Sequence, residues 1–232
     1  MKKRVIDPGV FSVQVAADLR RGEFKTKNTI LVENDVEVDF VFIGDSITHS
    51  CELNAYFGRD NKIIINRGIS GDVTRYALKR FDADVIQLRP KYCICLIGIN
   101  DAWDLEYNPV EHIEGKTVEE ILNEAYTNYI CMINKCKEAN INFIICSVLP
   151  TNMTHTNRDH ERNIYVFELN KKLKELCKRE GLIYVDYYSE FVDENHRVKD
   201  GLTFEGLHPN AEGYNLMMRI LKETLKRNDI DI

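Results

Sequence analysis

The sequence predicts an α/β fold in which helices cover both faces of a central, mainly parallel sheet. Two observations predict it. Short apolar runs alternate with longer amphipathic stretches along the 232 residues, as in strand–helix–strand units. The apolar runs are also continuous instead of alternating with polar residues, which is typical of strands covered on both faces. A chain of this length can bury one full core, so we expect residues 1–232 to form a single domain.

Five apolar runs are the predicted strands of this sheet. They are Asp39–Gly44, Lys62–Asn66, Tyr92–Gly98, Asn142–Val148 and Leu182–Asp186. Between and after them, apolar residues at helical spacing predict three long helices. The helices are expected over Val118–Cys136, opened by a capping box of Thr117 and Glu120, over Val166–Cys177, ended by Gly181, and over Tyr214–Leu225, opened by Pro209-Asn210.

The remaining segments have weaker patterns. Residues 1–38 are expected to be an N-terminal extension packed on the core, with a short helix over Phe11–Arg21 and a strand over Thr29–Val32. Trp103–Lys116 looks like a loop, and so does Thr151–Arg162, which is dense in Asn, Thr and His. Either loop can overhang a site at the edge of the sheet.

The composition restricts the partners and the compartment. A net charge of −6 argues against a nucleic-acid binder, which needs clustered Lys and Arg. Met1–Arg4 resembles the start of a signal peptide, but charged and turn residues interrupt any apolar segment behind it. No apolar run is long enough to cross a membrane. The seven cysteines are odd in number and mostly lie in apolar runs, which predicts buried thiols in a cytoplasmic protein without a metal site.

Four polar or glycine-containing segments follow predicted strands. They are Gly44-Asp45-Ser46, Gly68–Asp72, Gly98–Asp101 and Leu149-Pro150. The carboxyl ends of parallel strands meet at one edge of a sheet, where α/β proteins bind their ligands. We therefore expect these segments to meet at one site.

Ser46 is the candidate nucleophile of that site, and His208 is the candidate base. Ser46 is expected to be exposed at a strand-to-helix junction, and a serine hydroxyl attacks at neutral pH only when a nearby base takes its proton. His208 lies near the other end of the chain, in Glu205-Gly-Leu-His208-Pro-Asn. Each segment alone also fits a structural role as a helix cap or a turn. Their joint presence favours a hydrolase.

The motifs together resemble one known superfamily. Gly44-Asp45-Ser46-Ile47, Gly71, Gly98-Ile-Asn100-Asp101 and Gly206-Leu-His208-Pro-Asn resemble, in order, the four sequence blocks of the SGNH (GDSL-like) hydrolases. The resemblance implies a flavodoxin-like, three-layer α/β/α fold and ester hydrolysis without a metal or an organic cofactor. Asn66–Asp72 and Arg89-Pro-Lys are most similar to the acetylhydrolase branch, which includes the platelet-activating-factor type and bacterial carbohydrate acetylesterases.

The resemblance also implies a role for each matching residue. Ser46 is the nucleophile, and His208 is the general base that later protonates the leaving alcohol. The oxyanion hole combines the backbone N–H groups of Ser46 and Gly71 with the side-chain amide of Asn100.

The identity of the triad acid is open at this point. The superfamily usually has Asp three residues before the histidine, where this chain has Glu205. A glutamate can hold the imidazole tautomer if the backbone adjusts, and Asp200 is the rival acid. Ser70 is a second choice of nucleophile, because Gly68-Ile-Ser-Gly nearly matches the Gly-x-Ser-x-Gly pattern. The other histidines are expected in surface or loop positions: His49, His112, His155, His160 and His196.

Three functions fit these residues. The first is a serine esterase that cleaves a short acyl group, an acetyl group above all, from a carbohydrate or a related alcohol. The second is a lysophospholipase or thioesterase with a longer acyl pocket. The third is a flavodoxin-like module that binds a ligand without catalysis. The partner is a small molecule in each case, and Asp45 and Trp103 are its candidate contacts, although a packing role fits Trp103 equally well.

Overall fold

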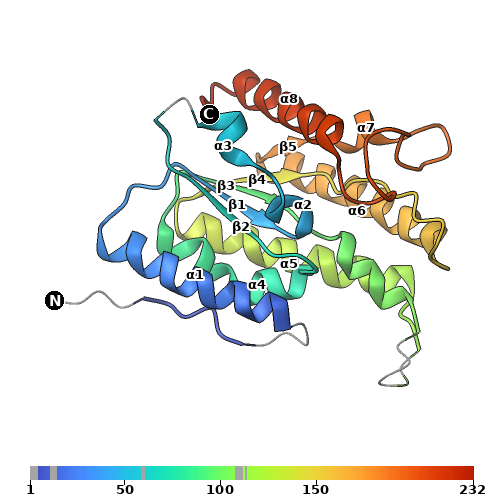
Figure 1. The fold of residues 1–232 in the computed structure, drawn as a ribbon, viewed down its shortest axis with the longest axis horizontal. Coiled ribbons are helices and arrows are strands. Elements are labelled where there is room, and N and C mark those ends of the chain that lie inside the picture. The colour runs from blue at the N-terminus through green and yellow to red at the C-terminus, as the bar shows by residue number, and fades with distance from the viewer. Residues whose placement is uncertain (1–4, 11–14, 59–60, 108–111, 113) are drawn as a thin grey trace. The chain divides into compact units, whose positions relative to one another are not determined.

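The computed structural model contains a five-stranded sheet with the strand order β2-β1-β3-β4-β5, flanked by helices (Figure 1). The structure describes residues 5–10, 15–58, 61–107, 112 and 114–232. The strands are β1 (Phe40–Gly44), β2 (Ile64–Gly68), β3 (Tyr92–Leu96), β4 (Asn142–Cys146) and β5 (Ile183–Val185). The predicted α/β fold with a parallel five-stranded sheet is confirmed, and this strand order is that of flavodoxin-like proteins.

The three long predicted helices are also present. The helices are α1 (Val15–Glu33), α2 (Ser46–His49), α3 (Leu53–Phe57), α4 (Thr74–Asp84), α5 (Val118–Glu138), α6 (Asp159–Glu180), α7 (Tyr188–Phe191) and α8 (Ala211–Arg227), with 3₁₀ helices η1 (Ile86–Leu88) and η2 (Ile99–Leu105). The capping box of α5 forms as expected: the Thr117 N–H donates to Glu120 Oε2 at 2.8 Å, and the Glu120 N–H donates to Thr117 Oγ1 at 3.2 Å. Asn210 caps α8 by accepting the Gly213 N–H at 3.0 Å.

The chain divides into two compact units. The first comprises residues 1–97 and 128–144, and the second comprises residues 98–127 and 145–232. The single-domain organisation therefore stays a prediction. Within the first unit, β1 pairs in parallel with both β2 and β3, and Gly44 lies opposite Gly68 and Leu96 in the register. The strand order changes direction between β1 and β3, and α/β proteins bind ligands beyond the strand ends at such a point.

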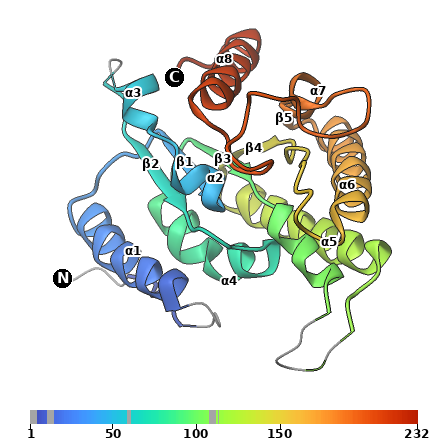
Figure 2. The ribbon, with the colours of Figure 1, turned by 45° about the vertical axis from the view of Figure 1, so that its right-hand side comes forward.

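Residues Val15–Glu33 form one continuous helix, α1, so the predicted strand over Thr29–Val32 is wrong. In α1, the buried residues recur at helical spacing: Ala17, Arg21, Phe24 and Asn28. This stripe faces α4, which lies beside α1 in the first unit (Figure 2). Thr29, Ile30 and Val32 lie outside this stripe but inside the same helix, whose packing overrides their local preference for a strand. The predicted helix over Phe11–Arg21 is described only from Val15, because residues 11–14 lie outside the described ranges.

Helices extend into both segments that were predicted to be loops, because η2 runs to Leu105 and α6 begins at Asp159. Trp103 lies inside η2, and residues 108–111 and 113 lie outside the described part of the chain. In the second unit, Asp159 and Asn163 of α6 hold the segment after β4. The Thr151 N–H donates to Asn163 Oδ1 at 2.9 Å, and the Met153 N–H donates to Asp159 Oδ1 at 3.0 Å. Buried side-chain acceptors thus replace the regular backbone partners that a loop lacks.

None of the seven cysteines, all within the described residues, forms a disulfide, and all except Cys131 are buried. This confirms the prediction of mostly buried thiols instead of a disulfide framework. Burial raises the pKa of the Cys146 thiol to about 12, which makes that group a poor nucleophile. Within the described ranges, no helix is both long and apolar enough to cross a bilayer. Met1–Arg4 falls outside those ranges.

Candidate active site

The candidate nucleophile opens a short helix at the end of the first strand. Ser46 is the first residue of α2 and follows Gly44, the last residue of β1, by two positions. Asp45 caps the helix, because its Oδ1 accepts the Ile47 N–H at 2.9 Å. Contrary to the expectation of an exposed serine, Ser46 is 8% exposed and Asp45 is 1% exposed. Within the first unit, α2 packs against both β1 and β2, and this packing covers the start of the helix.

Gly71, the second predicted oxyanion donor, lies in a tight turn beside the end of β1. The Asp72 N–H donates to the Ile69 carbonyl at 3.1 Å, and the Ile69 N–H donates to the Gly44 carbonyl at 3.0 Å. Gly71 has φ 75°, which is the left-handed conformation that a type II turn requires at its third position. The turn is therefore attached directly to the strand that leads to Ser46.

A contact between His49 and Ser70 was missed by the sequence analysis. The Ser70 hydroxyl lies 3.0 Å from His49 Nδ1, and the Ser70 N–H donates to the same nitrogen at 3.4 Å. Burial and the positive charge of Arg20 lower the pKa of His49, which favours the neutral imidazole that can accept both bonds. His49 is half-buried and joins α2 to the Gly71 turn, so Ser70 has a histidine partner of its own.

In the second unit, Glu205 contacts the candidate base. His208 Nδ1 is hydrogen-bonded to Glu205 Oε1, and the His208 N–H donates to Glu205 Oε2 at 3.4 Å. Gly206 has φ 86°, and its carbonyl accepts the Asn152 N–H at 2.8 Å. This glycine allows the turn that brings the two side chains together. The carboxylate fixes Nδ1 as the protonated nitrogen and leaves Nε2 as an acceptor.

Asn100 and Trp103 lie together on η2 of the second unit. Asn100 is 7% exposed, whereas Trp103 is 43% exposed. The Arg162 guanidinium lies 4.8 Å from the centre of the Trp103 ring and 3.7 Å from the Glu106 carboxylate. One part of the indole therefore packs on a buried cation, and another part is open to solvent. Trp103 therefore has both a packing contact and an exposed surface. The sequence alone left the choice between a packing role and a substrate contact open.

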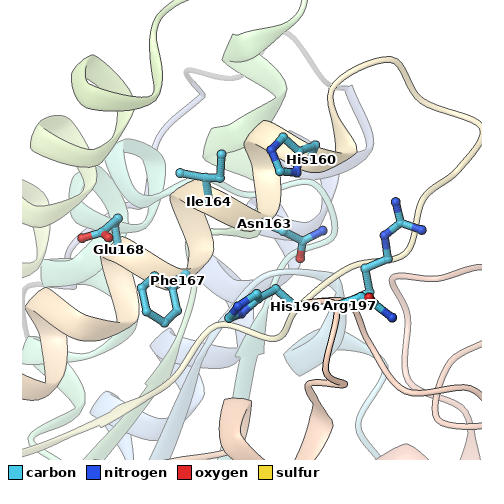
Figure 3. Close-up of a pocket in the computed structure, with 8 residues that line it drawn as sticks. His160, Asn163, Ile164, Phe167, Glu168, His196 and Arg197 are labelled. Carbon is cyan, nitrogen blue, oxygen red and sulfur yellow. The ribbon is translucent and has the colours of Figure 1, made fainter.

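A surface cavity of about 340 Å³ lies in the second unit, where α6 faces the segment after Val192 (Figure 3). The Phe167 ring lies edge-on to His196, with ring centres 5.6 Å apart. The lining residues are His160, Asn163, Ile164, Phe167, Glu168, Asn195, His196 and Arg197. None of the predicted site residues lines this cavity, so it contributes nothing to the chemistry assigned to Ser46 and His208.

The parallel sheet and its strand order match the SGNH hydrolase fold, and the chain has a serine just after its first strand and a carboxylate-bound histidine near its C-terminus. The chain belongs to the GDSL-like lipase/acylhydrolase family, whose model matches residues 42–216. The protein is therefore a carboxylic ester hydrolase.

Known proteins similar to this chain agree with that assignment. An acetylxylan esterase of Geobacillus stearothermophilus is 23% identical over 163 residues, which cover 67% of this chain and 68% of that protein. The structure of a GDSL-like lipase from Bacteroides thetaiotaomicron has a TM-score of 0.75 and 26% identity, and the match covers 89% of this chain and 97% of that one. A structure of the acetylxylan esterase shares the fold, with a TM-score of 0.62, 19% identity and coverage of 82% and 95%.

Proposed function

We propose that the protein hydrolyses a short-chain acyl ester, an acetyl ester of a carbohydrate or a related alcohol, through an acyl-enzyme on Ser46. The observation that carries the proposal is the hydrogen bond between Glu205 and His208 Nδ1. A carboxylate at Nδ1 favours the tautomer in which Nε2 can take a proton from a serine hydroxyl. Ser46 of the Gly44-Asp45-Ser46 motif, at the start of α2 and within the range that the family model matches, is the serine proposed to react.

In the proposed acylation step, Ser46 Oγ attacks the ester carbonyl carbon while His208 Nε2 takes the hydroxyl proton. Glu205 remains ionised and stabilises the imidazolium that forms. The tetrahedral intermediate then collapses, the bond to the alcohol oxygen breaks, and His208 returns its proton to that oxygen. The products of this step are the free alcohol and the acyl-Ser46 ester.

The negative charge of the tetrahedral intermediate needs donors that are already in position. We assign this role to the N–H groups of Ser46 and Gly71 and to the Asn100 side-chain amide. Each is neutral, and loss of one such donor typically lowers kcat by about 100- to 1,000-fold. Deacylation repeats the sequence with water as the nucleophile and releases the carboxylic acid.

The relatives support the choice of substrate and of residues. The similar Geobacillus protein is an acetylxylan esterase, and one of its structures is described as an acetyl-xylooligosaccharide esterase. Catalytic mutants of that esterase replace a serine, an aspartate and a histidine, the last two three positions apart (194 − 191). Glu205 and His208 have the same spacing here. The mostly buried thiols, which lie outside disulfides, further support a reducing compartment, the cytoplasm, for this enzyme.

Hydrolysis of p-nitrophenyl esters tests the proposal. Wild type is expected to hydrolyse the acetate ester, and Ser46→Ala is expected to abolish turnover. Wild type without activity on any ester of the series would contradict the esterase mechanism. A severalfold preference for decanoate over acetate would instead support the longer acyl pocket of a lysophospholipase or thioesterase, and a panel of acetylated sugars and lysolipids would then identify the natural class.

A further inference from the structure

A buried network of charges in the first unit connects the segments that carry Ser46 and Gly71. Arg80 of α4 lies at its centre and is fully buried. Arg80 Nη2 donates to the Gly44 carbonyl at 3.1 Å, two residues before Ser46. Arg80 Nε donates to Asp72 Oδ2 at 2.7 Å, one residue after Gly71. A single guanidinium therefore holds both segments through a rigid fork of donors.

Helix α1 adds a second cation to the same carboxylate. Arg21 Nη2 lies 3.4 Å from Asp72 Oδ1, and both side chains are fully buried. Ala17 and Phe24 of α1 also pack on Ile69, the first residue of the Gly71 turn. Residues 15–33 of α1 precede the part of the chain that the family model matches. The N-terminal extension thus reaches the turn that carries a predicted oxyanion donor.

The network also contains a matched pair of carboxylates. Asp84, the last residue of α4, accepts from Arg80 Nη1 at 2.9 Å and from Asn28 Nδ2 of α1 at 2.9 Å. Asp72 and Asp84 each bridge Arg80 to a side chain of α1, and both are buried. They differ in position, because only Asp72 adjoins Gly71. Burial alone lowers the pKa of Arg80, but the two carboxylates outweigh this effect and raise it, so Arg80 stays charged.

We propose that Asp72 and Arg80, with Arg21 of α1 behind them, are positioning residues of the esterase that fix the Ser46 and Gly71 N–H groups in one geometry. This inference rests on the proposed function, because it needs those N–H groups to bind the oxyanion. A displacement of about 1 Å at a catalytic group can lower the rate by about 100-fold. Holding the ends of both segments from one buried cation prevents such a displacement.

The test compares Asp72→Asn with Asp84→Asn. Each variant removes one buried charge next to Arg80 and keeps the side-chain volume, so both are expected to lower Tm. Asp72→Asn is expected to lower kcat for p-nitrophenyl acetate by about 10- to 100-fold with KM within about threefold, because the lost interactions act in the transition state. Asp84→Asn is expected to change kcat by less than about threefold when both are assayed well below their Tm values.

Equal kcat values for the two variants, in a wild type that turns over the acetate, would overturn the positioning role and leave the esterase mechanism intact. An inactive wild type would overturn the proposed function and this inference with it. Should Asp72→Asn fail to fold, Arg80→Lys takes its place, because it keeps the charge that both carboxylates require. Arg80 Nη1 also donates to the Arg67 carbonyl at 2.9 Å, so the guanidinium serves four acceptors, and an ammonium group has only three donors. The same loss of kcat at unchanged KM is therefore expected, and a wild-type kcat in Arg80→Lys would refute the proposal.

Discussion

Replacement of Glu205 by Gln tests the acid of the proposed triad. The exposure of the Glu205–His208 pair in the structure sets the expected loss of kcat. A hydrogen bond to a charged group contributes about 1.5–3 kcal/mol, and about 1.4 kcal/mol corresponds to a factor of ten in rate. The side chains of His208 and Glu205 are 39% and 41% exposed, so water screens this pair. We therefore expect kcat to fall by about 10- to 50-fold, well short of the roughly 10,000-fold known for a buried triad acid.

The assay for Glu205→Gln is steady-state hydrolysis of p-nitrophenyl acetate, with Tm measured on the same samples. KM is expected to stay within about threefold and Tm within about 2 °C, because the pair lies at the surface. Asp200→Asn is the matched control and is expected to be near neutral. A wild-type kcat in Glu205→Gln, together with a crippled Asp200→Asn, would refute the assignment. If both variants are near neutral, His208 works without a carboxylate, and the triad reasoning fails.

Three further predictions concern the substrate pocket, a histidine contact and the absence of a cofactor. Trp103→Ala is expected to shift KM or the ratio of acetate to decanoate turnover, and to lower the stability by about 1–2 kcal/mol because the Arg162 contact is lost. Trp103→Phe is expected to retain most of the wild-type turnover ratio and stability. An unchanged KM and ratio in Trp103→Ala would contradict a pocket role. Because the pKa of His49 is lowered by burial from its ordinary 6.5, the unfolded chain binds more protons near and below that pH. Tm is therefore expected to fall more steeply from pH 7.5 to 5 in wild type than in His49→Gln, and equal slopes would contradict the lowered pKa of His49. Ester hydrolysis is expected to survive EDTA, since neutral donors hold the oxyanion, and a loss that a divalent metal restores would count against the mechanism.

Much of the fold could be predicted because its signals are local. Continuous apolar runs located all five strands, and apolar spacing with capping residues located the three long helices. The contact between Glu205 and His208 could also be predicted, because the two residues lie three positions apart and need only the Gly206 turn to meet. Short-range patterns of this kind depend on few other parts of the chain.

The errors concern residues whose environment is set by distant partners. The buried face of α1 contains Arg21 and Asn28, which count as polar in any periodicity analysis. Their burial depends on Asp72 and Arg67, which lie 51 and 39 residues further along the chain. The same limit applies to His49, whose partner Ser70 is 21 residues away. Such pairs carry no local signal, so the contacts of α1 with the Gly71 turn and the His49–Ser70 contact emerged only from the structure.

The most direct test of the central claim is the identity of the serine that reacts. Ser46 and Ser70 are the two candidates, and Ser70 has the histidine contact that makes it a serious rival. Wild type, Ser46→Ala and Ser70→Ala would be treated with a fluorophosphonate, and the modified peptide would be identified by mass spectrometry. We predict a single adduct on Ser46 in wild type and in Ser70→Ala, and none in Ser46→Ala. An adduct on Ser70, or labelling that persists in Ser46→Ala, would contradict the assignment of Ser46 as the nucleophile.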